Sequence, residues 1–152
     1  MARQFPEIVA YGSAFRFALE AEAACGDLAA AAGVLAPDDA WRERLEFLVC
    51  AHDDRVQKLT VIRQEVNEMI LEPIHSLDGG DYLGTLDAEP AEQWPAVVEQ
   101  LAQAEEDAAR YHEDFVATAD DVLAASAWPA PRRACRGRCH RRGSGSARGS
   151  SR

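Results

Sequence analysis

The sequence predicts an all-α protein built as a bundle of long helices. Apolar residues recur at spacings of three and four over three segments of roughly 30 residues each, and alanine, glutamate and leucine dominate the composition. Nothing in the pattern argues for strands. With 152 residues, the chain has the size of one domain. We therefore expect one helical domain over residues 1–128 and a separate tail over residues 129–152.

The first helix is expected over residues 5–32. Gly33 follows its last apolar position, where glycine commonly terminates a helix. The apolar positions that define this helix are Ile8, Phe15, Leu19, Leu28 and Ala32.

The second helix is expected to begin at Pro37-Asp38-Asp39 and to stop near Glu72, before Pro73. Proline and acidic residues are common in the first turn of a helix, and proline is uncommon in the interior. A long apolar stripe connects the two ends, formed by Trp41, Leu45, Leu48, Val49, Val56, Leu59, Ile62, Val66 and Met69.

The third helix is expected from about Pro95 to about Ser126, with Val98, Leu101, Ala108, Phe115 and Val122 on its apolar face. The short connection 33–38 predicts an antiparallel hairpin between the first two helices. Residues 73–94 are long enough to cross the whole bundle, so the third helix is free to lie parallel or antiparallel to the second. Within this crossover a turn is expected at 78–81, and four residues are expected to pack on the helices: Tyr82, Leu83, Leu86 and Trp94.

Charge divides the chain into an acidic body and a basic tail. Eight of the sixteen Lys and Arg residues lie in 129–152, which has no Asp or Glu, so the body holds eight basic against 26 acidic residues, a net charge of −18. Such a body repels phosphate backbones and membrane surfaces, so nucleic acid is an expected partner only through the tail. No apolar run is long enough to span a membrane, and the cysteine spacing does not suggest a disulfide framework, which together favour a cytoplasmic protein.

The tail is rich in Arg, Gly and Ser and has no apolar periodicity, which predicts disorder. Cys135, Cys139 and His140 superficially suggest zinc or haem attachment, but the spacing fits neither group, and the few residue types in the tail make a chance match the better interpretation. The abrupt change of composition after Trp128 is also what a reading-frame change in GC-rich coding DNA produces. A fourth helix would then lie in another frame.

An internal repeat identifies the residues that could bind a metal or take part in chemistry. Residues 18–28 align with residues 101–111, and this alignment pairs Glu22 with Glu105, each on or beside an apolar stripe. Two buried carboxylates need compensation by a metal ion, a proton or an arginine. His52 lies on the apolar stripe of the second helix. The alternatives are that both glutamates are partly exposed, that His52 is a core histidine and that His112 is a histidine on the helix surface.

The pattern around these glutamates resembles the first and third helices of rubrerythrin-like members of the ferritin-like family: a helix of small residues carrying Glu, a small residue three later and an apolar or aromatic residue six later. The resemblance covers about residues 5–126. It implies two irons that activate dioxygen or peroxide, held by two such glutamates and by a Glu-x-x-His pair on each of two further helices. Here Val49 stands three residues before His52 where a carboxylate is expected, and no fourth helix follows the third.

These observations favour a ferritin-like protein with a partial or lost iron site, in which Glu22, His52 and Glu105 form at most one open site of low occupancy, and they lean away from an enzyme. The alternatives are a structural or protein-interaction bundle without metal and, more weakly, an RNA-associated protein that binds through its tail. No phosphate-binding loop or nucleophile motif appears in the sequence. A homo-oligomer is expected, because three helices of a four-helix plan leave an apolar groove.

Overall fold

The computed structural model describes residues 3–67, 70–71 and 73–118. Over this part of the chain the protein is helical and contains no β-strand, which confirms the all-α prediction. The helices, in chain order, are α1 (Tyr11–Leu35), α2 (Asp39–Glu65), the short α3 (Gly80–Leu83) and α4 (Trp94–Thr118). None of the described helices is long and apolar enough to cross a membrane.

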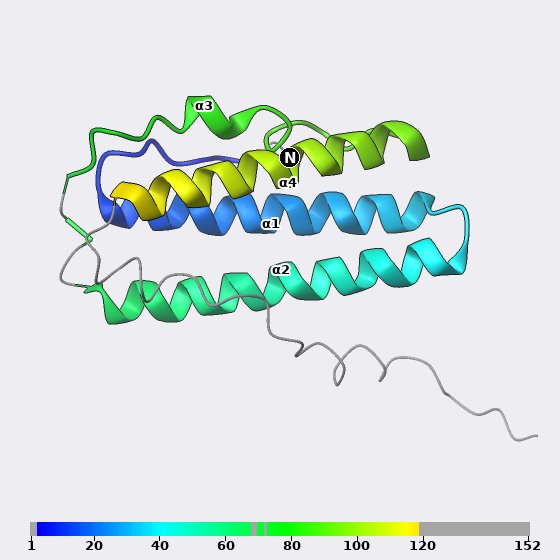
Figure 1. Ribbon diagram of the computed structural model, residues 1–152, viewed down its shortest axis with the longest axis horizontal. Helices are drawn as coiled ribbons and strands as arrows, with labels where there is room; N and C mark the ends of the chain where they lie inside the picture. The colour runs from blue at the N-terminus through cyan, green and yellow to red at the C-terminus, as the bar shows by residue number, and fades with distance from the viewer. Residues whose placement is uncertain (1–2, 68–69, 72, 119–152) are drawn as a thin grey trace, which may run out of the picture.

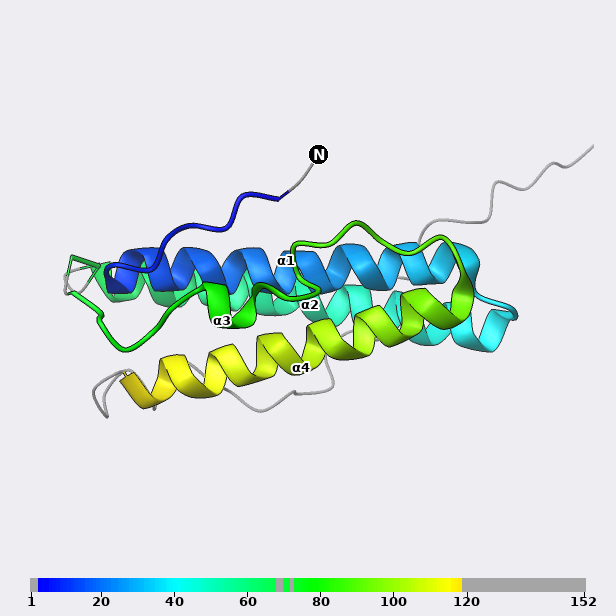
Figure 2. The ribbon, with the colours of Figure 1, turned by 90° about the horizontal axis from the view of Figure 1, so that it is seen from above.

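The three long helices lie side by side, with α1 in the middle (Figures 1 and 2). Helix α1 packs against both α2 and α4, whereas α2 and α4 have little direct contact. The chain reverses between α1 and α2, as the short connection predicts. The segment between α2 and α4 then runs the length of the bundle, so α4 is antiparallel to α1 and parallel to α2.

Helix α1 begins at Tyr11, so the predicted start at residue 5 is wrong. Residues before it form an extended segment, in which the Ser13 hydroxyl accepts hydrogen bonds from the N–H groups of Val9 (2.9 Å) and Ala10 (3.0 Å). The Val9 carbonyl accepts a bond from the N–H of Ile74, at 3.1 Å. This segment therefore pairs with the crossover instead of continuing the helix. At the other end α1 continues to Leu35, two residues past the predicted glycine stop.

Helix α2 begins as predicted, because the Asp38 carboxylate accepts a hydrogen bond from the N–H of Trp41 at 2.9 Å and caps the helix. It ends at Glu65, seven residues earlier than expected. The chain beyond it is held by another helix, since the N–H of Gly12 donates to the carbonyl of Ile70 at 2.9 Å. The described residues 66, 67, 70 and 71 are not α-helical, and this contact joins their segment to the start of α1.

Helix α4 begins at Trp94, with Pro95 in its first turn as expected, and its described part ends at Thr118. The predicted continuation to about Ser126 and the predicted disordered tail 129–152 lie outside the described residues.

The core follows the apolar stripes and is centred on α1. At one end, aromatic rings pack together, with the centroids of Phe17 and Tyr111 at 4.5 Å, and the Tyr111 hydroxyl donates to the Ala14 carbonyl at 2.7 Å. At the other end, small residues of α1 face α2 and α4 and allow the helices to approach closely. The crossover packs on the helices as expected, with Tyr82 and Leu86 buried.

One glycine of the crossover is expected to resist substitution. Gly84 has φ +28°, and a Cβ atom added there would lie 2.8 Å from Oδ2 of Asp107. Gly84→Ala should therefore lower the free energy of unfolding by about 1–3 kcal/mol in urea denaturation. Gly33→Ala is the control, because its added Cβ would lie 3.9 Å from Cβ of Leu45 inside a helix. The control should be neutral or stabilising, and an equal loss in both variants would contradict this explanation.

Candidate functional site

A buried polar cluster joins the three long helices near their midpoints. Glu22 comes from α1, His52 from α2, and Glu105 and His112 from α4. Glu22 and His52 are each 1% exposed and His112 is 6% exposed, whereas the Glu105 side chain is 32% exposed. The structure thus brings together the three predicted site residues, Glu22, His52 and Glu105.

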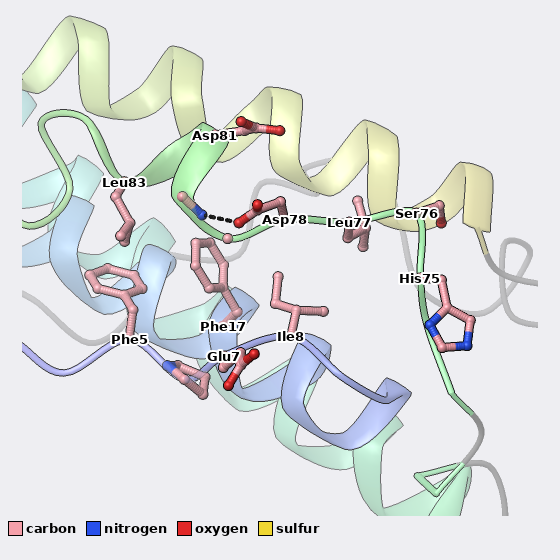
Figure 3. A pocket seen from close by; sticks show the side chains of 13 residues that line it. Phe5, Glu7, Ile8, Phe17, His75, Ser76, Leu77, Asp78, Asp81 and Leu83 are labelled. Atoms are coloured by element: carbon pink, nitrogen blue, oxygen red, sulfur yellow. Dashed lines mark hydrogen bonds between the residues drawn. The ribbon is translucent and has the colours of Figure 1, made fainter.

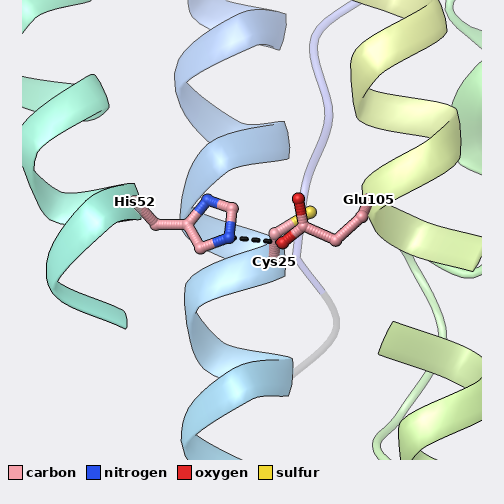
Figure 4. Close-up of side chains that lie close together, drawn as sticks. All are labelled: Cys25, His52 and Glu105. Carbon is pink, nitrogen blue, oxygen red and sulfur yellow. Dashed lines mark hydrogen bonds and ion pairs between the residues drawn. The ribbon is translucent and has the colours of Figure 1, made fainter. Parts of the chain in front are cut away.

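His52 lies between the two carboxylates. Its Nδ1 atom is 2.7 Å from Oε2 of Glu22, and its Nε2 atom is 2.5 Å from Oε1 of Glu105, the contact drawn in Figure 4. Ionised carboxylates only accept hydrogen bonds, so both ring nitrogens donate and the imidazole is positively charged. Burial alone would lower the pKa of His52, but the hydrogen bonds to Glu105 and Glu22 outweigh it and raise that pKa.

Glu22 is bonded to three side chains of the cluster. Besides His52, it accepts hydrogen bonds from Nε2 of His112 (2.7 Å, on Oε1) and from the Arg55 guanidinium (3.1 Å, on Oε2). Burial alone would raise its pKa. The hydrogen bonds from His112 and His52, together with the positive charge nearby, instead lower the pKa of Glu22 to about 2. Glu22 is therefore an ionised, fully paired carboxylate in the core.

The cluster is electrically balanced without a metal ion. The two carboxylates of Glu22 and Glu105 are matched by the His52 imidazolium and the Arg55 guanidinium. Of the three kinds of compensation that the sequence left open, the described residues supply a proton and an arginine. Since Glu22 is buried, it is not the partly exposed helix residue of the alternative interpretation, whereas Glu105 is partly exposed.

His112 corrects the sequence analysis, because it is buried and not on the helix surface. It bonds to Glu22 on the neighbouring helix. A signal was present, since Ala108 and Phe115, four residues before and three after His112, are apolar positions of the same face. Arg55 was also missed, because an arginine beside a helix stripe usually marks a solvated edge.

Cys25 is the other residue that sequence reasoning did not assign to the site. Its Sγ atom, a ring nitrogen of His52 and a carboxylate oxygen of Glu105 all lie within 4.8 Å of one another. Figure 4 shows these three side chains converging from three helices. Burial raises the pKa of the Cys25 thiol, and the negative charges of Glu105 and Glu22 raise it further, so the thiol is protonated at neutral pH. Its position three residues after Glu22 was the available signal.

The described residues do not fit a dinuclear iron centre. Such a centre needs about six protein ligands from four helices. Here Val49 occupies the position three before His52, and Glu22 and Glu105 bond to opposite nitrogens of the same ring. A single ion fits better, because one imidazole nitrogen, one carboxylate and one thiol converge on a common point.

Two hollows on the described surface lie away from this cluster. One, of about 530 Å³, lies between the N-terminal segment and the crossover, with the apolar side chains of Phe5, Ile8 and Phe17 between them (Figure 3). Its Asp78 carboxylate accepts a bond from the Gly80 N–H at 2.9 Å, as expected for the predicted turn. The hollow contains no member of the polar cluster, so the candidate chemistry remains in the core.

Comparison with known proteins finds no match: no protein family, no curated protein and no solved structure is similar to this chain.

Proposed function

We propose that this protein is a ferritin-like helical-bundle protein whose metal centre is reduced to one weakly binding position, and that it does not sustain dinuclear oxygen chemistry. The observation that carries the proposal is His52, buried at the centre of the bundle between carboxylates from two other helices. Two long helices in a hairpin and a third reached by a long crossover are consistent with this plan.

Weak binding follows from the charge balance of the cluster. An incoming cation must displace a proton from His52 and take Glu105 or Glu22 from an existing hydrogen bond. Metal binding therefore competes with proton binding, and the affinity falls as the pH falls. A site that is already neutral gains less from a cation than a pair of uncompensated carboxylates would.

Metal content tests this proposal directly. Protein purified without chelators should contain less than one ion per chain by elemental analysis, and chelator-treated protein should take up at most one ion per chain. Replacing His52 by glutamine should abolish this uptake, because it removes the nitrogen donor of the group formed by Cys25, His52 and Glu105. Stoichiometric binding of two irons per chain with peroxide-dependent turnover would show that the reduced-site proposal is wrong.

Self-association is favoured by the outer face of α2. Phe47 and Val61 are 59% and 52% exposed, and fourteen residues, nearly four helical turns, separate them on similar sides of the helix. Asp54 and Lys58 lie between them on the same side of the helix and form an ion pair at 3.4 Å, so the two apolar side chains stand on a mixed face and not on a continuous apolar patch. We propose that a second copy of the chain covers this face. A role in protein interaction is therefore compatible with the metal site.

The protein should sediment as a dimer or larger assembly at micromolar concentration. The double substitution Phe47→Glu and Val61→Glu should shift it to a monomer, since burying two carboxylates in the interface costs about 2–5 kcal/mol. Ala109→Glu, at an exposed position of α4, is the control and should leave the assembly intact. A monodisperse monomer of the unaltered chain would contradict self-association.

The RNA-binding alternative depends on the basic residues of 129–152, outside the described residues, and stays a prediction. Salt-sensitive RNA binding by the full chain that disappears when residues 129–152 are removed would support it.

A further inference from the structure

Three different ligand atoms converge on the α4 side of His52. They are Sγ of Cys25, a ring nitrogen of His52 and a carboxylate oxygen of Glu105, all mutually within 4.8 Å (Figure 4). Each comes from a different long helix, so the arrangement depends on the tertiary fold and not on local sequence. Thiolate, imidazole and carboxylate are the three side-chain donors found in protein zinc sites.

Glu22 has a different position relative to the imidazole ring. It accepts the hydrogen bond from Nδ1 and is itself held by His112 and Arg55, so it fixes the orientation of the His52 ring. A carboxylate that accepts the N–H of a histidine leaves the other ring nitrogen for a metal, an arrangement common around zinc. The nitrogen left for the metal is Nε2, which points toward Glu105.

We propose that Cys25, His52 through Nε2 and Glu105 bind one divalent ion of the zinc class, and that Glu22 is the positioning residue for His52 and not a ligand. This inference rests on the proposed binding of a single ion and names its ligands. It replaces iron by zinc, because a thiolate among the ligands favours the softer ion.

The spacing is suitable for such a site. Zinc lies about 2.0–2.3 Å from nitrogen, oxygen and sulfur ligands, so the ligand atoms of a tetrahedral site are about 3.3–3.8 Å apart. To reach this spacing, Nε2 of His52 and Oε1 of Glu105, now 2.5 Å apart, must separate by about 1 Å, and the widest pair must approach by up to about 1 Å. Glu105 can supply most of this movement, because its side chain is partly exposed while Cys25 and His52 are buried.

The exchange of protons for the ion conserves charge. Before binding, the thiol is neutral, His52 carries one positive charge and Glu105 one negative charge. On binding, the Cys25 S–H and the His52 Nε2–H bonds break, two protons leave to solvent, and the divalent cation takes their place. The net charge of the buried cluster is then unchanged, which removes the cost of placing two extra charges in the core.

Cobalt(II) provides a spectroscopic test as a substitute for zinc. The full chain, carrying Cys135→Ser and Cys139→Ser so that the tail supplies no thiol, is treated with a chelator and titrated with Co²⁺. We expect one equivalent of cobalt with a near-ultraviolet thiolate-to-cobalt absorption band, and zinc should displace it. Cys25→Ser in the same background should abolish the band and weaken zinc binding by about 10-fold or more. Cys50, which is disulfide-bonded in the structure, is not a ligand in this proposal, so the control Cys50→Ser in the same background should retain both.

Glu22→Gln separates the positioning role from ligation. Glutamine can still accept the Nδ1–H bond, so the cobalt band should remain while zinc affinity falls by about 10- to 100-fold. If Glu22→Gln abolishes binding while Cys25→Ser leaves it unchanged, Glu22 is a ligand and the inference is wrong. Circular dichroism checks the fold of each variant, and Glu105→Gln, at a partly exposed position, provides a second ligand variant if the Cys25 variant unfolds.

The outcomes also distinguish the two proposals. If cobalt and zinc bind at one equivalent with no thiolate band, the ligand assignment fails and single-ion binding stands. If neither zinc, cobalt nor iron binds to the chelator-treated chain, the proposed function and the ligand assignment both fail.

Discussion

Glu22→Ala should lower the free energy of unfolding by about 3–5 kcal/mol, the largest effect we expect from a single substitution in this chain. The change removes the carboxylate that bonds to His52, His112 and Arg55 together. His52 and Arg55 of α2 would then lose this carboxylate partner in a core from which water is excluded. Leaving one member of a buried charged network without its partner costs more than the network itself contributes.

Urea denaturation of the metal-free protein measures this effect. Glu20→Ala is the control on the same helix, because the Glu20 side chain is 40% exposed and bonds to Arg3 at the surface, so it should cost less than about 1 kcal/mol. Glu105→Ala should fall between the two, because Glu105 is 32% exposed and has one partner in the cluster. Unchanged or higher stability of Glu22→Ala would show that burial of this carboxylate is a net cost, offset in the native protein by a bound cation.

Helix type and order follow from the sequence, but helix ends do not. The apolar spacing identifies three long helices because each buries a continuous stripe against its neighbours. The start of α1 and the end of α2 instead depend on backbone hydrogen bonds between segments that are distant in the sequence. These bonds join Gly12 to Ile70 and Val9 to Ile74. Local propensity contains no information about such pairs.

The candidate site, too, could be predicted from the sequence only in part. Glu22, His52 and Glu105 could be assigned to one place, because each occupies the middle of a helix beside an apolar stripe. The sequence could not show that the two glutamates bond to opposite nitrogens of one ring, which depends on how α2 and α4 are rotated about α1. Cys25 could not be assigned to the site for a related reason. A buried cysteine has the pattern of any small core residue, and only the tertiary fold places it beside His52 and Glu105.

The metal-free protein should be most stable between about pH 4.5 and pH 6.5, from the pKa shifts of Glu22 and His52. The pKa of Glu22 falls from 4.5 to about 2 on folding, so its contribution, on the order of 3 kcal/mol, is complete above pH 4.5 and is lost as the pH falls toward 2. The pKa of His52 is raised above 6.5 on folding, so its contribution is complete below pH 6.5 and is lost as the pH rises through the raised value.

Several charged groups from all three helices face these two side chains. Glu22 is faced by His52 and Arg55 from α2 and by His112 from α4, and His52 is faced by Glu22 and Cys25 from α1 and by Glu105 from α4.

Urea unfolding of chelator-treated protein from about pH 3 to about pH 9 measures both limbs of the profile. Glu22→Gln should flatten the acid limb, because glutamine does not titrate, and His52→Gln should flatten the alkaline limb for the same reason. Both variants are expected to have a lower free energy of unfolding than the unaltered protein at every pH. The test is therefore how steeply that free energy changes with pH, and not its maximum value. If the unaltered protein becomes steadily more stable from pH 6 to about pH 8, the folded cluster holds no extra proton and His52 is neutral when folded. The two carboxylates would then lack the imidazolium as a partner, and the charge balance that makes the site a weak metal binder would be wrong.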